Sequence, residues 1–253
     1  MRLLLLLLTC LLSLTAAAAP MRHLVVMIGE DEYKTWETLP EFAKTDLEPA
    51  GYRVTLIHAD KTDKNNFPGL TAALGDADLL FISVRRRTPY QEQLDAIHAH
   101  LAAGKPLLGI RTASHAFALR PKDKITDPKL AAWQLFDPEV FGGHYTNHHG
   151  AGPQTTLTFA PGADKHPILS GLTAAQLPGN GSLYLVSPLI PTAIPLLIGT
   201  IPDKPAEPVA WTHRYGPKQA RIFYTSLGHP DDFKNPAFRR LLTNAITWSL
   251  TKD

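Results

Sequence analysis

Four short apolar runs alternate with segments of helical periodicity in the first half of the chain, and this alternation limits the folds available to it. The runs extend from His23 to Gly29, Arg53 to His58, Asp78 to Val84 and Lys105 to Ile110. Short apolar runs bounded by turn residues are typical of buried strands. Strands separated by helices predict a mainly parallel, doubly wound sheet with helices on both faces, so we expect an α/β fold.

Three helices are predicted to begin at capping signals in which Thr or Asn is followed by Glu or Pro. The signals are Thr38 with Glu41, Thr88 with Pro89, and Asn235 with Pro236. A short helix is also expected near residues 130–135. The later strand-like runs are Thr155 to Phe159, Ser182 to Val186, Leu196 to Gly199, Val209 to His213 and Arg221 to Ser226. Such consecutive strands predict a partly antiparallel extension of the sheet.

The N-terminal residues have the layout of a secretory signal peptide. Arg2 precedes an apolar run from Leu3 to Leu14, and small residues follow from Ala16 to Ala19. The apolar run is shorter than the roughly 20 residues of a membrane span, which disfavours the alternative of a retained anchor. We therefore predict that residues 1–19 are a cleaved signal, that residues 20–253 form one domain, and that the protein is periplasmic or secreted.

Cys10, inside that predicted signal, is the only cysteine of the chain. The mature protein would then have no thiol, which excludes a cysteine nucleophile. An exported protein without disulfides suits a bacterial periplasm. The formal net charge of +2 is too small to indicate a nucleic-acid partner.

Ligands of doubly wound sheets bind beyond the carboxyl ends of the strands, so polar residues that directly follow the predicted strands are candidate site residues. Those after the first, third and fourth runs are Glu30, Asp31, Arg85, Arg86, Arg111 and His115. The loop FGGHYTNHHG adds His144, Asn147, His148 and His149, and the stretch after the last strand-like run adds His229, Asp231 and Asp232. Capping by the carboxylates and a solvated surface for the arginines are the structural alternatives.

Three histidines close together, His144, His148 and His149, raise the alternative of a metal site that would also include His229. Imidazole is a common ligand of zinc and of other divalent metals such as manganese. The Gly-rich flanks indicate a loop, however, where spacing carries less geometric meaning than on a helix, and no carboxylate accompanies the histidines at a signature spacing. Acid-base chemistry or contacts to substrate hydroxyls are therefore the preferred interpretation.

Several stretches of the chain resemble a known family. They include GIRTASHAF, FGGHYTNHHG, HPILSGL, PVAWTHRYG, RIFYTSLGHPDDF and NPAFRRLLTNAITWSL. Together they resemble the ThuA-like (trehalose utilisation) family from about Arg22 to Leu250. The resemblance implies the class I glutamine amidotransferase-like fold, with a flavodoxin-like sheet. Amidotransferases of that fold place a nucleophilic Cys where this chain has Arg111, whereas their His-Pro pair corresponds to His229 and Pro230. A guanidinium cannot act as a nucleophile, so we expect no glutamine amidotransferase activity.

The resemblance also implies a role in the catabolism of trehalose and related disaccharides, in a pathway with a sugar 3-dehydrogenase that forms 3-keto sugars. We hypothesise that the protein acts on a keto-sugar or glycoside by hydrolysis, elimination or isomerisation. His229, oriented by Asp231 or Asp232, would be the acid or base, and His148 its counterpart.

In this hypothesis Arg85 and Arg111 hold the carbonyl or enolate oxygen of the substrate. Two alternatives stay open: a non-catalytic sugar-binding or sensing protein, and a metal-dependent sugar hydrolase. Apolar loops such as Leu189 to Leu197 would allow a homodimer.

Overall fold

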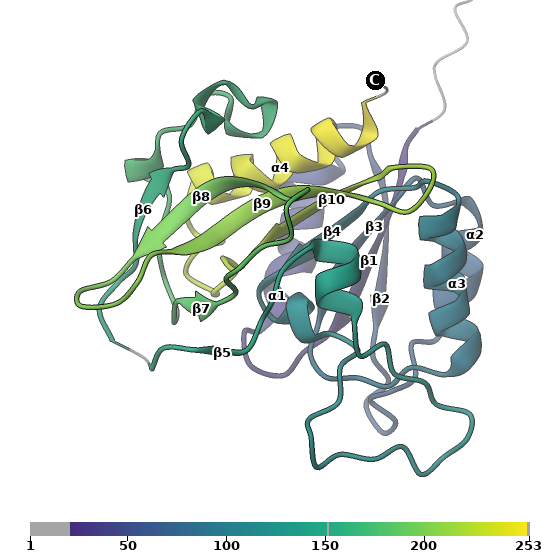
Figure 1. Cartoon of the computed structure of the whole chain (residues 1–253). Helices are drawn as coiled ribbons and strands as arrows, with labels where there is room; N and C mark the ends of the chain where they lie inside the picture. Colours follow the sequence, from purple (N-terminus) through teal and green to yellow (C-terminus); the bar gives the residue numbers. More distant parts are fainter. Residues whose placement is uncertain (1–20, 151, 252–253) are drawn as a thin grey trace, which may run out of the picture.

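The computed structural model describes residues 21–150 and 152–251. The predicted signal peptide lies outside the described residues. Eight strands form one sheet in the order β2-β1-β3-β4-β10-β9-β8-β6 (Figure 1). Five of them run parallel: β1 His23–Gly29, β2 Arg53–His58, β3 Leu79–Val84, β4 Leu107–Ile110 and β10 Ala220–Thr225. The expected flavodoxin-like, doubly wound fold is confirmed.

The antiparallel extension is confirmed as well. β9 runs antiparallel to β10, and each further strand reverses direction again. The strands of this extension are β9 Glu207–Tyr215, β8 Ile194–Thr200 and β6 Thr156–Phe159. A separate two-stranded sheet pairs β5 Asn147–His148 with β7 Tyr184–Leu185 and carries part of the histidine-rich loop.

Helices cover both faces of the sheet because both sets of strand side chains are apolar. Along β1, Leu24, Val26 and Ile28 face α1 Thr35–Phe42 and α4 Pro236–Leu250, whereas Val25 and Met27 face α2 Leu70–Asp76 and α3 Gln91–Ala102. Figure 1 shows α2 and α3 beside each other on one face and α4 across the other. A fully buried Leu or Phe on either face contributes about 1.5–3 kcal/mol.

Three sequence predictions about helices are corrected by the structure. α1 begins at Thr35 and not at Thr38, because the buried carboxylate of Glu30 accepts the hydrogen bond from the Thr35 amide (2.8 Å). α3 begins at Gln91, since the amide of Thr88 bonds to Asn65 in a loop. Residues 130–135 are not helical; a π-helical turn, Asp137–Phe141, follows them instead. The cap of α4 is confirmed, with Asn235 Oδ1 accepting from the amide of Ala237.

The register of the parallel strands aligns their carboxyl ends. Gly29 pairs with Val84, Ile82 with Gly109, and Ile110 with Thr225. The residues that follow β1, β3, β4 and β10 therefore meet at one edge of the sheet, as the sequence predicts. No helix among the described residues is long and apolar enough to cross a membrane.

Candidate functional site

Arg111 occupies the junction between β4 and a 3-10 turn, Arg111–His115, at the centre of this edge. Its backbone is left-handed, with φ of 51°. Such a conformation costs a non-glycine residue about 1–3 kcal/mol and persists only where the surroundings hold it. The hydroxyl of Tyr224 donates to the Arg111 carbonyl (2.6 Å) and provides part of that support.

The guanidinium of Arg111 lies between two tyrosine rings. Its central carbon is 4.5 Å from the centroid of Tyr33 and 4.6 Å from that of Tyr184. Nη1 donates to the carbonyls of Ser226 (2.7 Å) and Ser182 (3.1 Å), and Nη2 donates to the hydroxyls of Tyr33 and Ser182. We refer to this arrangement as the Tyr33–Arg111–Tyr184 stack.

The stack gives Arg111 a role that the sequence does not predict. The residue is 2% exposed, and both terminal nitrogens are already used by protein acceptors. A guanidinium held in this way is not open to a substrate oxygen, so the expected substrate contact of Arg111 is replaced by a scaffold role. A Cβ added at Gly181 would lie 2.4 Å from Nη2, so glycine there makes room for the guanidinium.

His229 lies beside the Tyr33 end of the stack, with its ring 6.3 Å from that of Tyr33. Asp232, which is completely buried, accepts hydrogen bonds from the amides of Gly228 (2.8 Å) and His229 (2.9 Å), and Asn180 donates to its other oxygen. Burial raises the pKa of Asp232, although these hydrogen bonds oppose the shift. Asp232 thus orders the backbone at Gly228 and His229.

The imidazole of His229 is one-third exposed and is oriented by Asp231. The amide of Asp231 donates to His229 Nδ1 (3.2 Å), so Nδ1 is the acceptor in the neutral ring and the proton is on Nε2. The Asp231 carboxylate is 3.6 Å from Nδ1 and also accepts from Lys234 (2.6 Å), which lowers its pKa. His229 therefore presents an N–H donor at Nε2.

His148 lies in β5, near Tyr184. Its ring is 6.1 Å from that of Tyr184. His148 Nδ1 is 2.8 Å from the carbonyl of His149. A carbonyl only accepts, so Nδ1 carries the proton in the neutral ring and Nε2 has a free lone pair. His148 and His229 thus have opposite tautomers.

His115 is buried and stacks on Tyr145, with ring centroids 4.3 Å apart. Burial, followed by the charge of Arg86, holds the pKa of His115 well below its ordinary value, so the ring is neutral at neutral pH. The guanidinium of Arg86 donates to the Ala118 carbonyl, and that of Arg85 pairs with Glu32 (2.7 Å). Both arginines are partly exposed and give this side of the site positive charge.

Glu30 is 3% exposed and stabilises the loop that leads into α1. Its carboxylate accepts from the amides of Glu32, Tyr33 and Thr35 and from the Thr35 hydroxyl, at 2.6–2.8 Å. The capping alternative therefore describes Glu30 better than substrate binding. Asp31, in contrast, is about half exposed and binds both Lys64 (2.9 Å) and Arg87 (2.6 Å).

The histidine-rich loop does not assemble a ligand cluster with the groups around it. Across residues 21–150 and 152–251, no three or more His, Cys, Asp or Glu side chains gather in a metal-binding arrangement. His144 and Asn147 are exposed, and Nε2 of His149 is buried without a hydrogen-bond partner. The alternative of a metal site formed by His144, His148, His149 and His229 is therefore not assembled among the described residues.

Asp137 is a buried acid that the sequence analysis does not identify. Its Oδ2 accepts from the amide of Tyr145 (2.6 Å), which orders the loop before β5, while Oδ1 has no hydrogen-bond partner. Burial raises its pKa to about 7. The sequence also does not single out Tyr33, Tyr145 or Tyr184 as site residues. Tyr33 follows β1, Tyr145 lies in the stretch FGGHYTNHHG, and Tyr184 lies in the strand-like run from Ser182 to Val186.

A model of the ThuA family, described as trehalose utilisation, matches residues 49–249. The chain belongs to the ThuA family. The predicted membership is thus confirmed, and the family description gives the protein a carbohydrate-related role. None of the curated proteins compared with the chain matches it.

Solved structures share the fold of this ThuA family member at low sequence identity. A protein from Bacteroides uniformis described as ThuA-like is 18% identical, with a TM-score of 0.63 and coverage of 94% of both chains. One from Parabacteroides merdae is 14% identical, with a TM-score of 0.59 and coverage of 91% of this chain and 90% of that one. A β-galactosidase from Rahnella sp. R3 is 14% identical, with a TM-score of 0.56, over 92% of this chain and 32% of the enzyme. These likenesses show the fold alone.

Proposed function

We propose that this ThuA family member cleaves or rearranges a keto-sugar or keto-glycoside by acid-base catalysis, with His148 as the base and His229 as the acid. The opposite tautomers of the two histidines carry the proposal. Nδ1 of His148 donates to a carbonyl, and Nδ1 of His229 accepts from an amide. In these tautomers Nε2 of His148 has a lone pair that can accept a proton, and Nε2 of His229 carries a proton that can be donated, as a general base and a general acid require.

A 3-keto group makes this assignment chemically productive because it acidifies the hydrogen on the neighbouring C2. Nε2 of His148 takes that proton, and the C2 electron pair forms a C1–C2 double bond as the bond from C1 to the leaving oxygen breaks. Nε2–H of His229 protonates the leaving oxygen. Arg85 and Arg86, which are partly exposed, favour the negative charge that develops on the 3-keto oxygen. Addition of water to the double bond completes a net hydrolysis.

Isotope exchange separates the two proposed roles. With methyl 3-keto-glucoside in D₂O, whose alkoxide leaving group needs protonation, His229→Ala is expected to keep exchange of the C2 hydrogen but to release methanol about 10²–10⁴-fold more slowly. His148→Ala is expected to lose both exchange and release. His144→Ala is the matched control, because this exposed histidine belongs to the same loop. Wild-type release rates in both His148→Ala and His229→Ala would refute the proposal.

A non-catalytic sugar-binding protein is the second candidate. The observation in its favour is Arg111, which fills the position of a nucleophile and is 2% exposed. Binding of the keto-glycoside without C2 exchange and without release, in the unmodified protein, would establish this alternative.

A further inference from the structure

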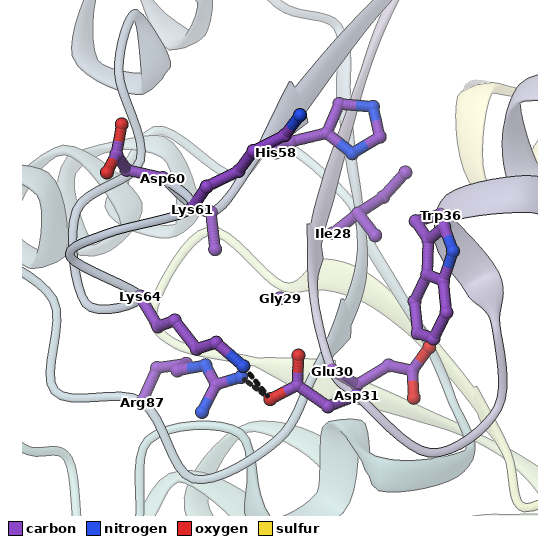
Figure 2. A pocket seen from close by; sticks show the side chains of 11 residues that line it. Ile28, Gly29, Glu30, Asp31, Trp36, His58, Asp60, Lys61, Lys64 and Arg87 are labelled. Carbon is purple, nitrogen blue, oxygen red and sulfur yellow. Dashed lines mark hydrogen bonds and ion pairs between the residues drawn. The ribbon is translucent and has the colours of Figure 1, made fainter.

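A concave site lies at the carboxyl ends of β1 and β2, and its lining includes none of the three residues of the Tyr33–Arg111–Tyr184 stack. It is a pocket of about 390 Å³, with Gly29 from β1 and His58 from β2 in its wall. Figure 2 shows Trp36 on one side of the pocket and Lys61 and Lys64 on the other, with Gly29 between them. Glycine is required at position 29 because a Cβ there would lie 2.7 Å from the ring of buried Phe67.

Trp36 gives this pocket one apolar wall. Trp36 is 40% exposed, whereas Trp133 and Trp211 are at most 8% exposed. An exposed indole on the first turn of α1 loses the free energy that burial of its apolar surface would provide. Trp36 therefore contributes little to the stability of the core. An open aromatic face next to hydrogen-bonding groups is suited to the C–H face of a sugar ring.

The charges of the pocket disfavour an anionic ligand. Three carboxylates, those of Glu30, Asp31 and Asp60, balance three cations, those of Lys61, Lys64 and Arg87. Figure 2 shows that Lys64 and Arg87 both reach Asp31, at 2.9 Å and 2.6 Å. Because two of the three cations are already paired, a phosphate would have to compete with a carboxylate of the protein.

The ion pairs of Asp31 leave one of its carboxylate oxygens able to accept hydrogen bonds from hydroxyl groups of a ligand. Lys64 and Arg87 both bind Oδ2 of Asp31, and no described residue donates a hydrogen bond to its Oδ1. Asp60 uses Oδ1 for the amides of Thr62 and Asp63 and for the Thr62 hydroxyl. Carboxylate oxygens held in fixed positions accept strong hydrogen bonds from neutral O–H donors.

We propose that this pocket is a sugar subsite in which a neutral pyranose ring stacks on Trp36 and donates hydroxyl hydrogen bonds to Asp31 and Asp60. Its lining indicates which ring it takes. The residues that line the pocket include neither His148 nor His229, the two proposed catalytic groups. The subsite therefore holds the sugar that is not attacked, an assignment that rests on the proposed function.

Indole NMR tests the subsite without any need for turnover. The protein labelled with ¹⁵N-tryptophan is titrated with trehalose, and the Trp36 signal is assigned by its absence in Trp36→Leu. We expect trehalose to shift the Trp36 signal and Trp36→Leu to weaken trehalose binding about tenfold or more. Trp248→Phe is the control, because this indole packs against Arg221 on another part of the surface.

Two results would overturn the subsite. One is a Trp36 signal that stays in place while trehalose binds. The other is a Trp36 signal that moves with inorganic phosphate and not with trehalose, which would make the pocket an anion site. The subsite and the reaction can also fail separately. A trehalose-dependent shift of Trp36 in a protein whose His148→Ala and His229→Ala variants release methanol from methyl 3-keto-glucoside at the wild-type rate would keep the subsite and reject the acid-base proposal.

Discussion

Asp137 provides a test of the electrostatics of the loop before β5. Its folded-state pKa of about 7 lies above the ordinary value of 3.8 because the carboxyl is buried. Between these two values the native state binds a proton that the unfolded state has released, so the free energy of unfolding falls as the pH rises. The contribution is fully present below about pH 4 and is lost by about pH 7.

The size of the effect follows from the shift. About three pKa units at about 1.36 kcal/mol each give about 4 kcal/mol as an upper value, of which about 2.3 kcal/mol is lost between pH 5 and pH 7. Asp137→Asn removes the ionisation, while its amide oxygen can still accept from the Tyr145 amide. We therefore expect the variant to gain stability relative to the wild type as the pH rises.

Urea unfolding of both proteins at several pH values between about 5 and 8 gives the required comparison. The difference between the two proteins is the relevant quantity, because other groups titrate in the same range. Burial lowers the pKa of His100 to about 4, for example, which makes stability rise with pH and partly masks Asp137 in the wild type alone. A constant difference in unfolding free energy across this range would refute the reasoning.

Two further substitutions test the scaffold of the site. Glu30→Gln should lower the free energy of unfolding by about 2–3 kcal/mol, because its NH₂ group would face backbone N–H groups that now donate to the carboxylate. Asp31→Asn, at a half-exposed position, should change the same free energy by under about 1 kcal/mol. Equal urea midpoints for the two variants would contradict this. Arg111→Lys should lower the free energy of unfolding by about 3 kcal/mol. A lysine ammonium cannot bond to both Ser226 and Tyr33, and it has no planar group to lie between the two rings. An unchanged melting temperature would disprove the scaffold role.

The sequence predicts the central strands well because the signal is local. Residues 23–29 are apolar without interruption, and a strand buried on both faces requires this. The start of α1 was misplaced because the group that fixes it, Glu30, lies outside the helix and its burial depends on the fold. Residues 130–135 have helical spacing, but tertiary contacts place the helical turn after them.

The sequence predicts where the candidate site lies but not which of its residues reach solvent. The rule about carboxyl ends correctly brings Arg111, His115 and His229 to one edge of the sheet. Which of them reaches solvent depends on Tyr184, which comes from a segment far along the chain and covers one side of the guanidinium. No periodicity or spacing links that tyrosine to Arg111, so the sequence suggested a ligand contact where the structure has a packed side chain.

Arg111 has a strained, left-handed backbone without the exposed, reactive side chain that often accompanies such a backbone. A strained residue at a junction between a strand and a turn commonly marks the nucleophile of an α/β enzyme, since the bend exposes its side chain. In this chain the bend is kept, but the side chain turns inward and joins three loops through Ser182, Ser226 and Tyr33. The backbone geometry typical of a nucleophile holds an anchoring side chain here, so a search for covalent catalysis based on backbone shape would select a residue that cannot perform it.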